Sequence, residues 1–164
     1  MIYPVLLFPN PVLRETCRAA HWKSPNTQHF IKHLIATLYA QRGGIGIAAP
    51  QVGRSQRIIV VDVSPRDPSK KREIMLNPVI LYREGEVLSR EGCMSLPDYT
   101  ANVKRARRVL IEWLDERGHR QRKTAGGIEA ICLQHELDHL RGLLFIDRVA
   151  SLKTDIFVRK GHSS

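Results

Sequence analysis

The sequence HELDHL at residues 135–140 constrains this chain more than any other feature. Two histidines stand four residues apart, with a glutamate directly after the first. On a helix, four residues turn the chain by about 400°, so His135 and His139 share one face, one turn apart. Their imidazoles can bind one metal ion together while Glu136 projects beside them. The H-E-x-x-H pattern therefore predicts a metal-dependent hydrolase, with the glutamate as general base for a metal-bound water.

The alternative is that two unrelated surface histidines coincide. The preceding residues argue against it, because Ile128, Ile131 and Cys132 fall on the same helical face as His135. We therefore expect this face to point into a core, where imidazoles need polar or metal partners.

A catalytic metal site needs a third protein ligand besides the two histidines. No further histidine follows His139 at the metzincin spacing, and no glutamate follows the helix. Cys93, in the segment EGCMS, is the best upstream candidate, although it could equally be a small buried hydrophobic residue. Cys132 is a rival, which we expect to be structural because its sulfur would lie alongside His135 and not across the ion. A cysteine with two histidines suits Zn²⁺ or Fe²⁺.

The composition predicts one domain spanning residues 1–164. Hydrophobic residues make up 43% of the chain, an ordinary share for a globular protein. Three cysteines are too few, and too odd in number, for a disulfide framework. The N-terminus lacks the basic region of a signal peptide, and no stretch approaches the roughly 18 apolar residues of a membrane span. We therefore expect a cytoplasmic location and no membrane association.

The charge balance is less ordinary, because 26 Lys and Arg against 16 Asp and Glu give a net charge of +10. A basic surface favours polyanionic partners such as nucleic acid or the ribosome, or acidic substrates. Solubility alone explains the charge equally well. Ribosome contact is therefore a hypothesis, to which a short basic tail with Lys153, Arg159 and Lys160 could contribute.

Hydrophobic periodicity and turn residues predict five regular elements. They are an amphipathic helix over residues 25–41, a buried strand over 57–63, a strand over 74–83 kinked at Asn77 and Pro78, a hairpin from 107–115 and the segment after the turn, and a central buried helix over 124–141, opened by Thr124 and closed at Gly142. No internal repeat or linker interrupts the chain.

The glycine-rich run GIGIAAPQVG at residues 44–53 has two interpretations. Such runs are usually turns. Because Gly44 and Gly46 carry no side chain, another extended chain could also pair alongside their backbone. A phosphate loop is excluded by the lack of a GK[ST] sequence.

Three segments, GIGIAAPQVG, EGCMSLP and QHELDH, together resemble the signature motifs of peptide deformylases, in the same order and at similar separations. The resemblance runs from YPVLLFPNPVLR near the N-terminus to FIDRV after the helix. It implies a compact single-domain α+β fold, with mixed and antiparallel sheets around a central metal-binding helix. It also implies hydrolytic removal of the N-formyl group from the initiator methionine of new polypeptides, with release of formate.

The resemblance assigns roles to individual residues. It implies one divalent metal ion on Cys93, His135 and His139, with Fe²⁺ in the cell and Zn²⁺, Ni²⁺ or Co²⁺ as substitutes. Glu136 is the implied general base and acid, and Gln51 and the Met94 backbone N–H are implied oxyanion donors. The residues implied in substrate binding are Gly44, Ile45 and Gly46 along the peptide backbone, and Ile45, Glu91, Ile128, Ile131, Cys132 and His135 around the methionine side chain.

The chain departs from the family pattern at three positions. Met94 replaces a commoner leucine, and Pro50 replaces a frequent threonine before Gln51; neither change touches the expected chemistry. Thr100 stands where some members carry an arginine, so the resemblance does not define the preference beyond methionine.

Two other functions fit the sequence less well. A small H-E-x-x-H metallopeptidase lacks its downstream ligand here. A basic RNA- or ribosome-binding module with a structural metal would need four protein ligands, and only three good ones are visible.

Overall fold

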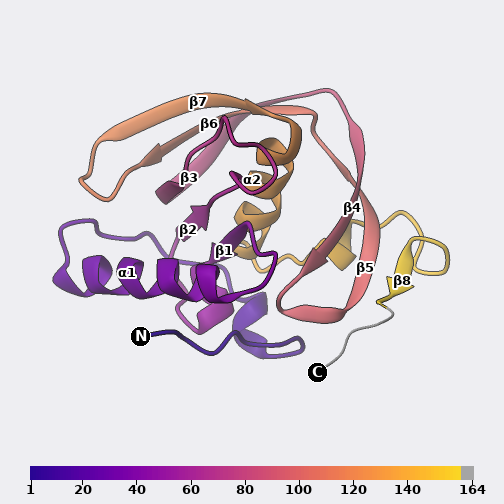
Figure 1. Cartoon of the computed structure of the whole chain (residues 1–164), viewed down its shortest axis with the longest axis horizontal. Helices are drawn as coiled ribbons and strands as arrows, with labels where there is room; N and C mark the ends of the chain where they lie inside the picture. Colours follow the sequence, from indigo (N-terminus) through magenta and orange to yellow (C-terminus); the bar gives the residue numbers. More distant parts are fainter. Residues whose placement is uncertain (160–164) are drawn as a thin grey trace.

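The computed structural model of the chain describes residues 1–159 (Figure 1). Its elements, in chain order, are the 3-10 helix η1 (Pro11–Arg14), α1 (Pro25–Ala40), β1 (Gly46–Ala48), the 3-10 helix η2 (Ala49–Val52), β2 (Ile58–Val61), β3 (Glu73–Glu84), β4 (Val87–Cys93), β5 (Leu96–Arg105), β6 (Arg108–Leu114), β7 (Arg120–Gly126), α2 (Gly127–His139), the 3-10 helix η3 (Phe145–Arg148) and β8 (Ile156–Val158). Five strands form one sheet in the order β1-β2-β3-β6-β7, and three form another in the order β4-β5-β8. All these strands pair antiparallel.

Strand β2 shows why the five-stranded sheet is covered on both faces. Alternate side chains of a strand point to opposite faces. Ile58 and Val60 pack in the buried cluster that contains the apolar side of α1. Ile59 and Val61 pack in a second cluster with Leu133 of α2. The predicted buried strand is thus confirmed, and the sheet lies between the two helices.

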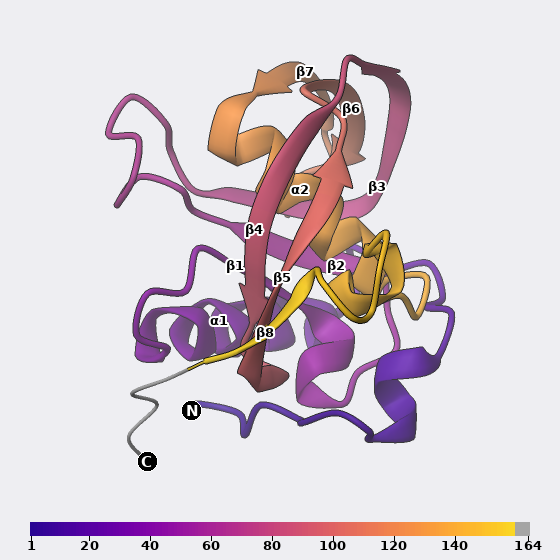
Figure 2. The ribbon, with the colours of Figure 1, turned by 90° about the vertical axis from the view of Figure 1, so that its right-hand side faces the viewer.

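The three-stranded sheet covers another side of α2 (Figure 2). Leu96, Ala101 and Val103 of β5 pack with Leu144 and Phe145 around η3. Helix α2 therefore lies between the two sheets, which confirms the predicted α+β fold around a central helix. No helix within residues 1–159 is long and apolar enough to cross a membrane.

Several predicted elements are confirmed. The first predicted helix is α1, and the predicted hairpin is formed by β6 and β7. The kink in β3 is also present. Its register against β6 shifts between Leu76 and Val79, and Asn77 in between has a positive φ of 52°.

The predicted start of the central helix at Thr124 is wrong. Thr124 lies in β7 opposite Leu110, and the hairpin continues until Gly126 pairs with Arg108. The helix begins at Gly127, whose φ of 54° lets the chain turn from strand to helix. No strand was predicted after the central helix, yet β8 pairs with β5. The last residue of the predicted basic tail, Lys160, lies outside the described residues.

Candidate active site

The end of β4 meets the last turns of α2 at a cluster of three metal-binding side chains. Ligand atoms of Cys93, His135 and His139 all lie within 4.8 Å of one another, and Cys93 Sγ is 3.4 Å from His139 Nε2. Tetrahedral coordination with ordinary metal–sulfur and metal–nitrogen bonds places such atoms about 3.4–3.6 Å apart. The rival Cys132 lies outside this cluster, with its Sγ 3.6 Å from the Ile45 carbonyl oxygen. These three residues therefore fit one metal ion.

The orientation of His135 is set by Glu91. Glu91 Oε1 lies 2.9 Å from His135 Nδ1, so the opposite ring nitrogen is left for a metal. Arg105 donates to both oxygens of the same carboxylate, over 2.8 and 2.7 Å. Burial alone would raise the pKa of Glu91, but the hydrogen bonds from Arg105 and His135 outweigh it and lower the pKa to about 2. Glu91 is therefore a carboxylate at neutral pH.

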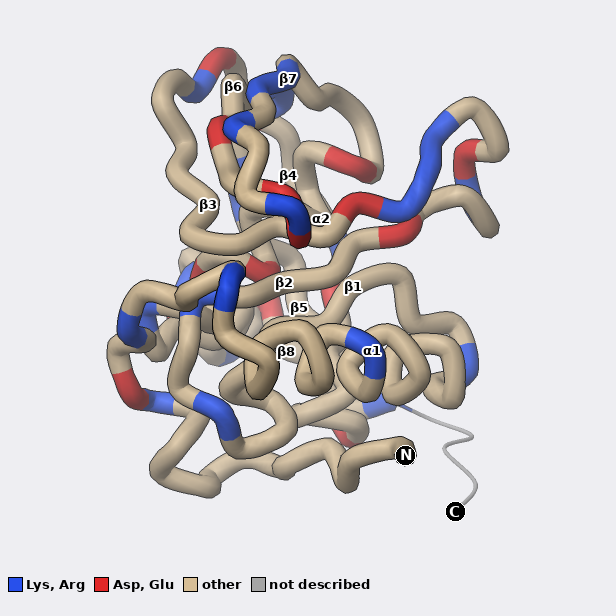
Figure 3. Tube along the Cα trace, turned by 90° about the vertical axis from the view of Figure 1, so that its left-hand side faces the viewer, with Lys and Arg blue, Asp and Glu red and all other residues tan. Residues whose placement is uncertain are grey.

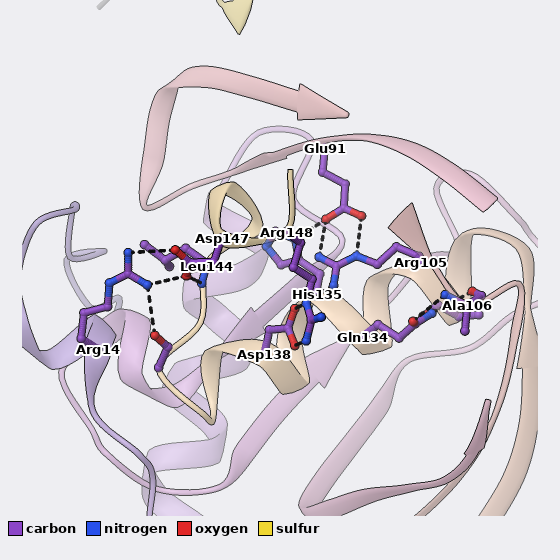
Figure 4. A network of polar contacts seen from close by, with 12 residues as sticks. Arg14, Glu91, Arg105, Ala106, Gln134, His135, Asp138, Leu144, Asp147 and Arg148 are labelled. Atoms are coloured by element: carbon purple, nitrogen blue, oxygen red, sulfur yellow. Dashed lines mark hydrogen bonds and ion pairs between the residues drawn. The ribbon is translucent and has the colours of Figure 1, made fainter. Parts of the chain in front are cut away.

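The same network continues through α2 to η3 (Figure 4). Arg105 Nη1 donates to Asp138 Oδ2 over 2.7 Å, and Arg148 donates to both Asp138 oxygens over 2.6 and 2.7 Å. The side chains of Glu91, Arg105 and Asp138 are at most 8% exposed. This buried network ties together β4, β5, α2 and η3 behind the metal ligands. Arg105, Asp138 and Arg148 were not predicted as site residues, because no local sequence motif contains all three of them.

Glu136 lies beside the ligands without a fixed partner. Its side chain is buried, and Oε1 has no hydrogen-bond partner among residues 1–159. Burial raises the pKa of Glu136 to about 7. A carboxyl group with this pKa can both accept and return a proton at neutral pH.

Gly46 makes room for Glu136. A Cβ at position 46 would lie 2.7 Å from Glu136 Oε2 and 2.7 Å from Cys132 Sγ. No side chain fits there without displacing these groups. The glycine in β1 is thus required by close packing against α2 and not by a turn.

The amide of Gln51 is held in one orientation. Its Oε1 accepts from the Ala48 N–H over 2.9 Å, while Nε2 donates to Ser95 Oγ over 3.2 Å and faces Cys93 Sγ at 3.5 Å. The donor end of this buried amide therefore points toward the metal-ligand cluster. Ser95 was not predicted as a site residue.

A cavity of about 510 Å³ opens in front of this cluster. Every predicted site residue lines it except His139, which is 1% exposed and lies behind the wall. The predicted contact of the Ile128 face of α2 with the core is present, since Ile128 packs against the buried cluster that contains Cys132. Ile128 and Ile131 are only partly buried because their face borders this cavity.

The family model described as polypeptide deformylase matches residues 2–155. The peptide deformylase of Thermodesulfovibrio yellowstonii is 42% identical over 159 residues, which cover 97% of this chain and 96% of the relative. The chain belongs to the polypeptide deformylase family.

Solved deformylases share the fold. The crystal structure of a peptide deformylase from Legionella pneumophila matches with a TM-score of 0.86 and 36% identity, over 93% of this chain and 89% of that one. A deformylase from Acinetobacter baumannii, solved with Met-Ala-Ser bound, matches with a TM-score of 0.83 and 33% identity, over 91% and 99% of the two chains. The resemblance of the three sequence motifs is confirmed.

Deformylases are metal-dependent hydrolases, and this chain is an enzyme of that kind. It removes the N-formyl group from newly synthesised polypeptides by hydrolysis. The geometry of the Cys93, His135 and His139 cluster fits the metal that this activity requires. His139 suits that role because burial lowers its pKa, which keeps the imidazole neutral and able to coordinate.

Proposed function

We propose that Cys93, His135 and His139 hold one divalent metal ion, Fe²⁺ in the cell, which Zn²⁺, Ni²⁺ or Co²⁺ can replace. One thiolate with two imidazoles suits these borderline and soft cations. The close approach of Cys93 Sγ to His139 Nε2 is the observation that carries this proposal. An ion bound there supplies Lewis acidity, which activates water and polarises the formyl carbonyl.

Glu136 is the proposed general base and acid. Its buried carboxylate can take a proton from the attacking water and deliver it to the leaving amine nitrogen. Its raised pKa of about 7 matches both steps near neutral pH. The products are formate and a free N-terminal amine.

Gln51 and Met94 are the proposed oxyanion donors. The Nε2 of Gln51 already faces the cluster, since its Oε1 is bound to the Ala48 N–H. The backbone N–H of Met94 follows Cys93 directly in the cavity wall. Each such donor typically stabilises the developing charge by about 3–4 kcal/mol.

The substrate is proposed to bind along the edge strands of the two sheets. Within residues 1–159, strand β1 pairs only with β2 and β4 pairs only with β5, so each has a second edge. Gly44, Ile45 and Gly46 lie on the β1 side and can pair with an extended peptide backbone. The residues proposed around the methionine side chain are Ile45, Glu91, Ile128, Ile131, Cys132 and His135. Glu91 contributes through its position in the wall, because its carboxylate is bound by Arg105 and His135.

We also propose that the whole chain, residues 1–164, acts as one catalytic domain in the cytoplasm and contacts the ribosome through its basic surface. Lys and Arg are spread over several loops and strands in Figure 3, and the net charge is +10. Co-sedimentation with ribosomes at low ionic strength tests this contact. Failure to co-sediment at every salt concentration would exclude it.

The central experiment is anaerobic purification followed by metal analysis and an assay with formyl-Met-Ala-Ser. We expect release of formate and about one metal ion per chain, with activity lost in air and restored by Ni²⁺. Activity that survives complete removal of metal would overturn the proposed centre. Equal hydrolysis of unformylated peptides would instead indicate a metallopeptidase.

A further inference from the structure

Four arginines surround the outer part of the cavity. Arg42 precedes β1, Arg66 lies between β2 and β3, Arg90 lies in β4, and Arg159 follows β8. All four are exposed, whereas the ligands and Glu136 lie in the more buried part of the wall. We call these four residues the arginine rim.

No carboxylate balances this charge within residues 1–159. The only acids that line the cavity are Glu91 and Glu136, and both are buried. Glu91 is already paired with Arg105 and His135. None of the rim arginines forms an ion pair in the part of the chain that the structure describes. The outer part of the cavity therefore carries the positive charge of these arginines without carboxylates that neutralise it.

Two rim residues are held in place by the C-terminal strand. The Arg90 guanidinium stacks 3.6 Å from the centre of the Phe157 ring, and its Nε donates to Thr100 Oγ1 over 3.0 Å. Arg159 donates its backbone N–H to the Asp98 carbonyl over 2.8 Å. The segment of β8 therefore holds the Arg90 guanidinium and the Arg159 backbone beside β4 and β5.

Arg159 also lies directly over the strand that carries Cys93. A Cβ at Gly92 would lie 2.5 Å from Arg159 Nη2. Glycine at position 92 thus lets this guanidinium approach the backbone next to a metal ligand. The positive charge extends from the rim toward the reacting end of the cavity.

We propose that the arginine rim makes this enzyme prefer formylated peptides with aspartate or glutamate directly after the methionine. This inference rests on the proposed function, in which the formyl group and methionine side chain occupy the inner cavity. The rest of the peptide must then leave past the rim. An extended chain advances about 3.3 Å per residue, so the second to fourth residues pass the arginines.

The preference has a defined kinetic signature. The rim is exposed, so each arginine acts through a screened charge, and salt weakens the interaction. No rim arginine is among the groups proposed to act on the reacting carbon. The effect therefore appears in KM and kcat/KM, and kcat changes little between peptides.

The test compares three C-terminally amidated peptides, formyl-Met-Asp-Ser, formyl-Met-Ala-Ser and formyl-Met-Lys-Ser. We expect kcat/KM of the metal-loaded enzyme to fall in that order, about tenfold overall at low salt, and to converge at 0.5 M salt, a concentration at which charges are screened within about 4 Å. Reversing Arg90 and Arg159 together (Arg90→Glu with Arg159→Glu) should lower the Asp-to-Lys ratio of kcat/KM by roughly threefold per residue.

The matched control reverses two exposed arginines that do not line the cavity, Arg117→Glu with Arg120→Glu. It changes the net charge equally and should keep the wild-type ratio. Equal kcat/KM for the three peptides, or an equal loss of the ratio in the control, overturns the inference. If none of the three peptides is deformylated, the proposed function itself has failed.

Discussion

Glu91 Oε1 lies 2.9 Å from His135 Nδ1, and both oxygens of that carboxylate are also bound by Arg105. The orientation of the His135 ring is therefore set by a charge network that includes Arg105 of β5. Asp138, three residues after His135 on the same helix, binds the other side of Arg105. The arrangement of the cluster thus depends on Arg105 and Asp138, which do not line the cavity.

Arg105→Met should strongly destabilise the protein. The change leaves the buried carboxylates of Glu91 and Asp138 without their shared cation, which typically costs about 3–5 kcal/mol. Urea denaturation measures the loss of unfolding free energy. Arg108→Met is the control, because Arg108 and its partner Glu84 are both exposed. Loss of this exposed ion pair should change the urea midpoint little. Similar effects of the two variants would contradict a structural role for the buried network.

Glu136→Gln should retain the metal and lose most turnover. The amide keeps the shape of the side chain but cannot accept a proton from water. We expect kcat to fall by about 10² to 10⁴-fold, the usual contribution of a general base. Metal content is measured alongside formate release. A variant that keeps both its metal and its full activity would exclude the proton-transfer role.

Cys93→Ala should lower metal content and activity together. Two imidazoles alone bind a divalent cation far more weakly than a site with a thiolate. The readout is metal per chain by elemental analysis after gel filtration. Cys17→Ala is the matched control, since Cys17 is a buried thiol in the core and outside the cavity. Equal metal loss in both variants would point to general destabilisation.

Gly46→Ala should impair catalysis in a folded protein. Its methyl group would displace the Glu136 carboxylate or the Cys132 sulfur, each 2.7 Å away. We expect kcat/KM to fall at least tenfold, while circular dichroism stays unchanged. Gly126→Ala is the control, because its Cβ would meet nothing closer than 3.6 Å. Normal activity of Gly46→Ala would show that the contact is easily relieved.

Asp147→Asn tests the acid stability of the N-terminal segment. Burial would raise the pKa of Asp147, but hydrogen bonds from Arg14 and the Leu144 N–H outweigh it and lower the pKa below 3.8. A carboxylate whose pKa is lower in the folded state than in the unfolded state stabilises the fold at pH values above the unfolded-state pKa. This contribution disappears as the pH falls through the folded-state pKa. The variant should therefore be less stable than the wild type at pH 7. The difference should shrink as the pH falls below 3.8 and the carboxylate becomes protonated, as followed by urea midpoints. A difference that persists in acid would rule out the charge as its source.

The juxtaposition of His135 and His139 could be predicted because its geometry is local. His135 and His139 are one helical turn apart, and that spacing holds wherever the helix lies. The start of α2 could not be predicted from the sequence, because it depends on how far the hairpin extends. Strand β7 continues to Gly126, which pairs with Arg108, eighteen residues earlier. Arg105 and Asp138 are 33 residues apart and meet only after both sheets have packed. The arginine rim likewise draws on four segments with no common pattern.

Helix α2 uses two different faces, and this limits where residues can be inserted into or deleted from the chain. One face carries His135 and His139, and a different face carries Asp138. A single inserted residue before His135 would rotate every later side chain by about 100° relative to the residues before it. The ligands, the general base and Asp138 would all leave their partners at once. Natural length variation should therefore be absent from α2 and concentrate in exposed loops, such as residues 64–72 between β2 and β3.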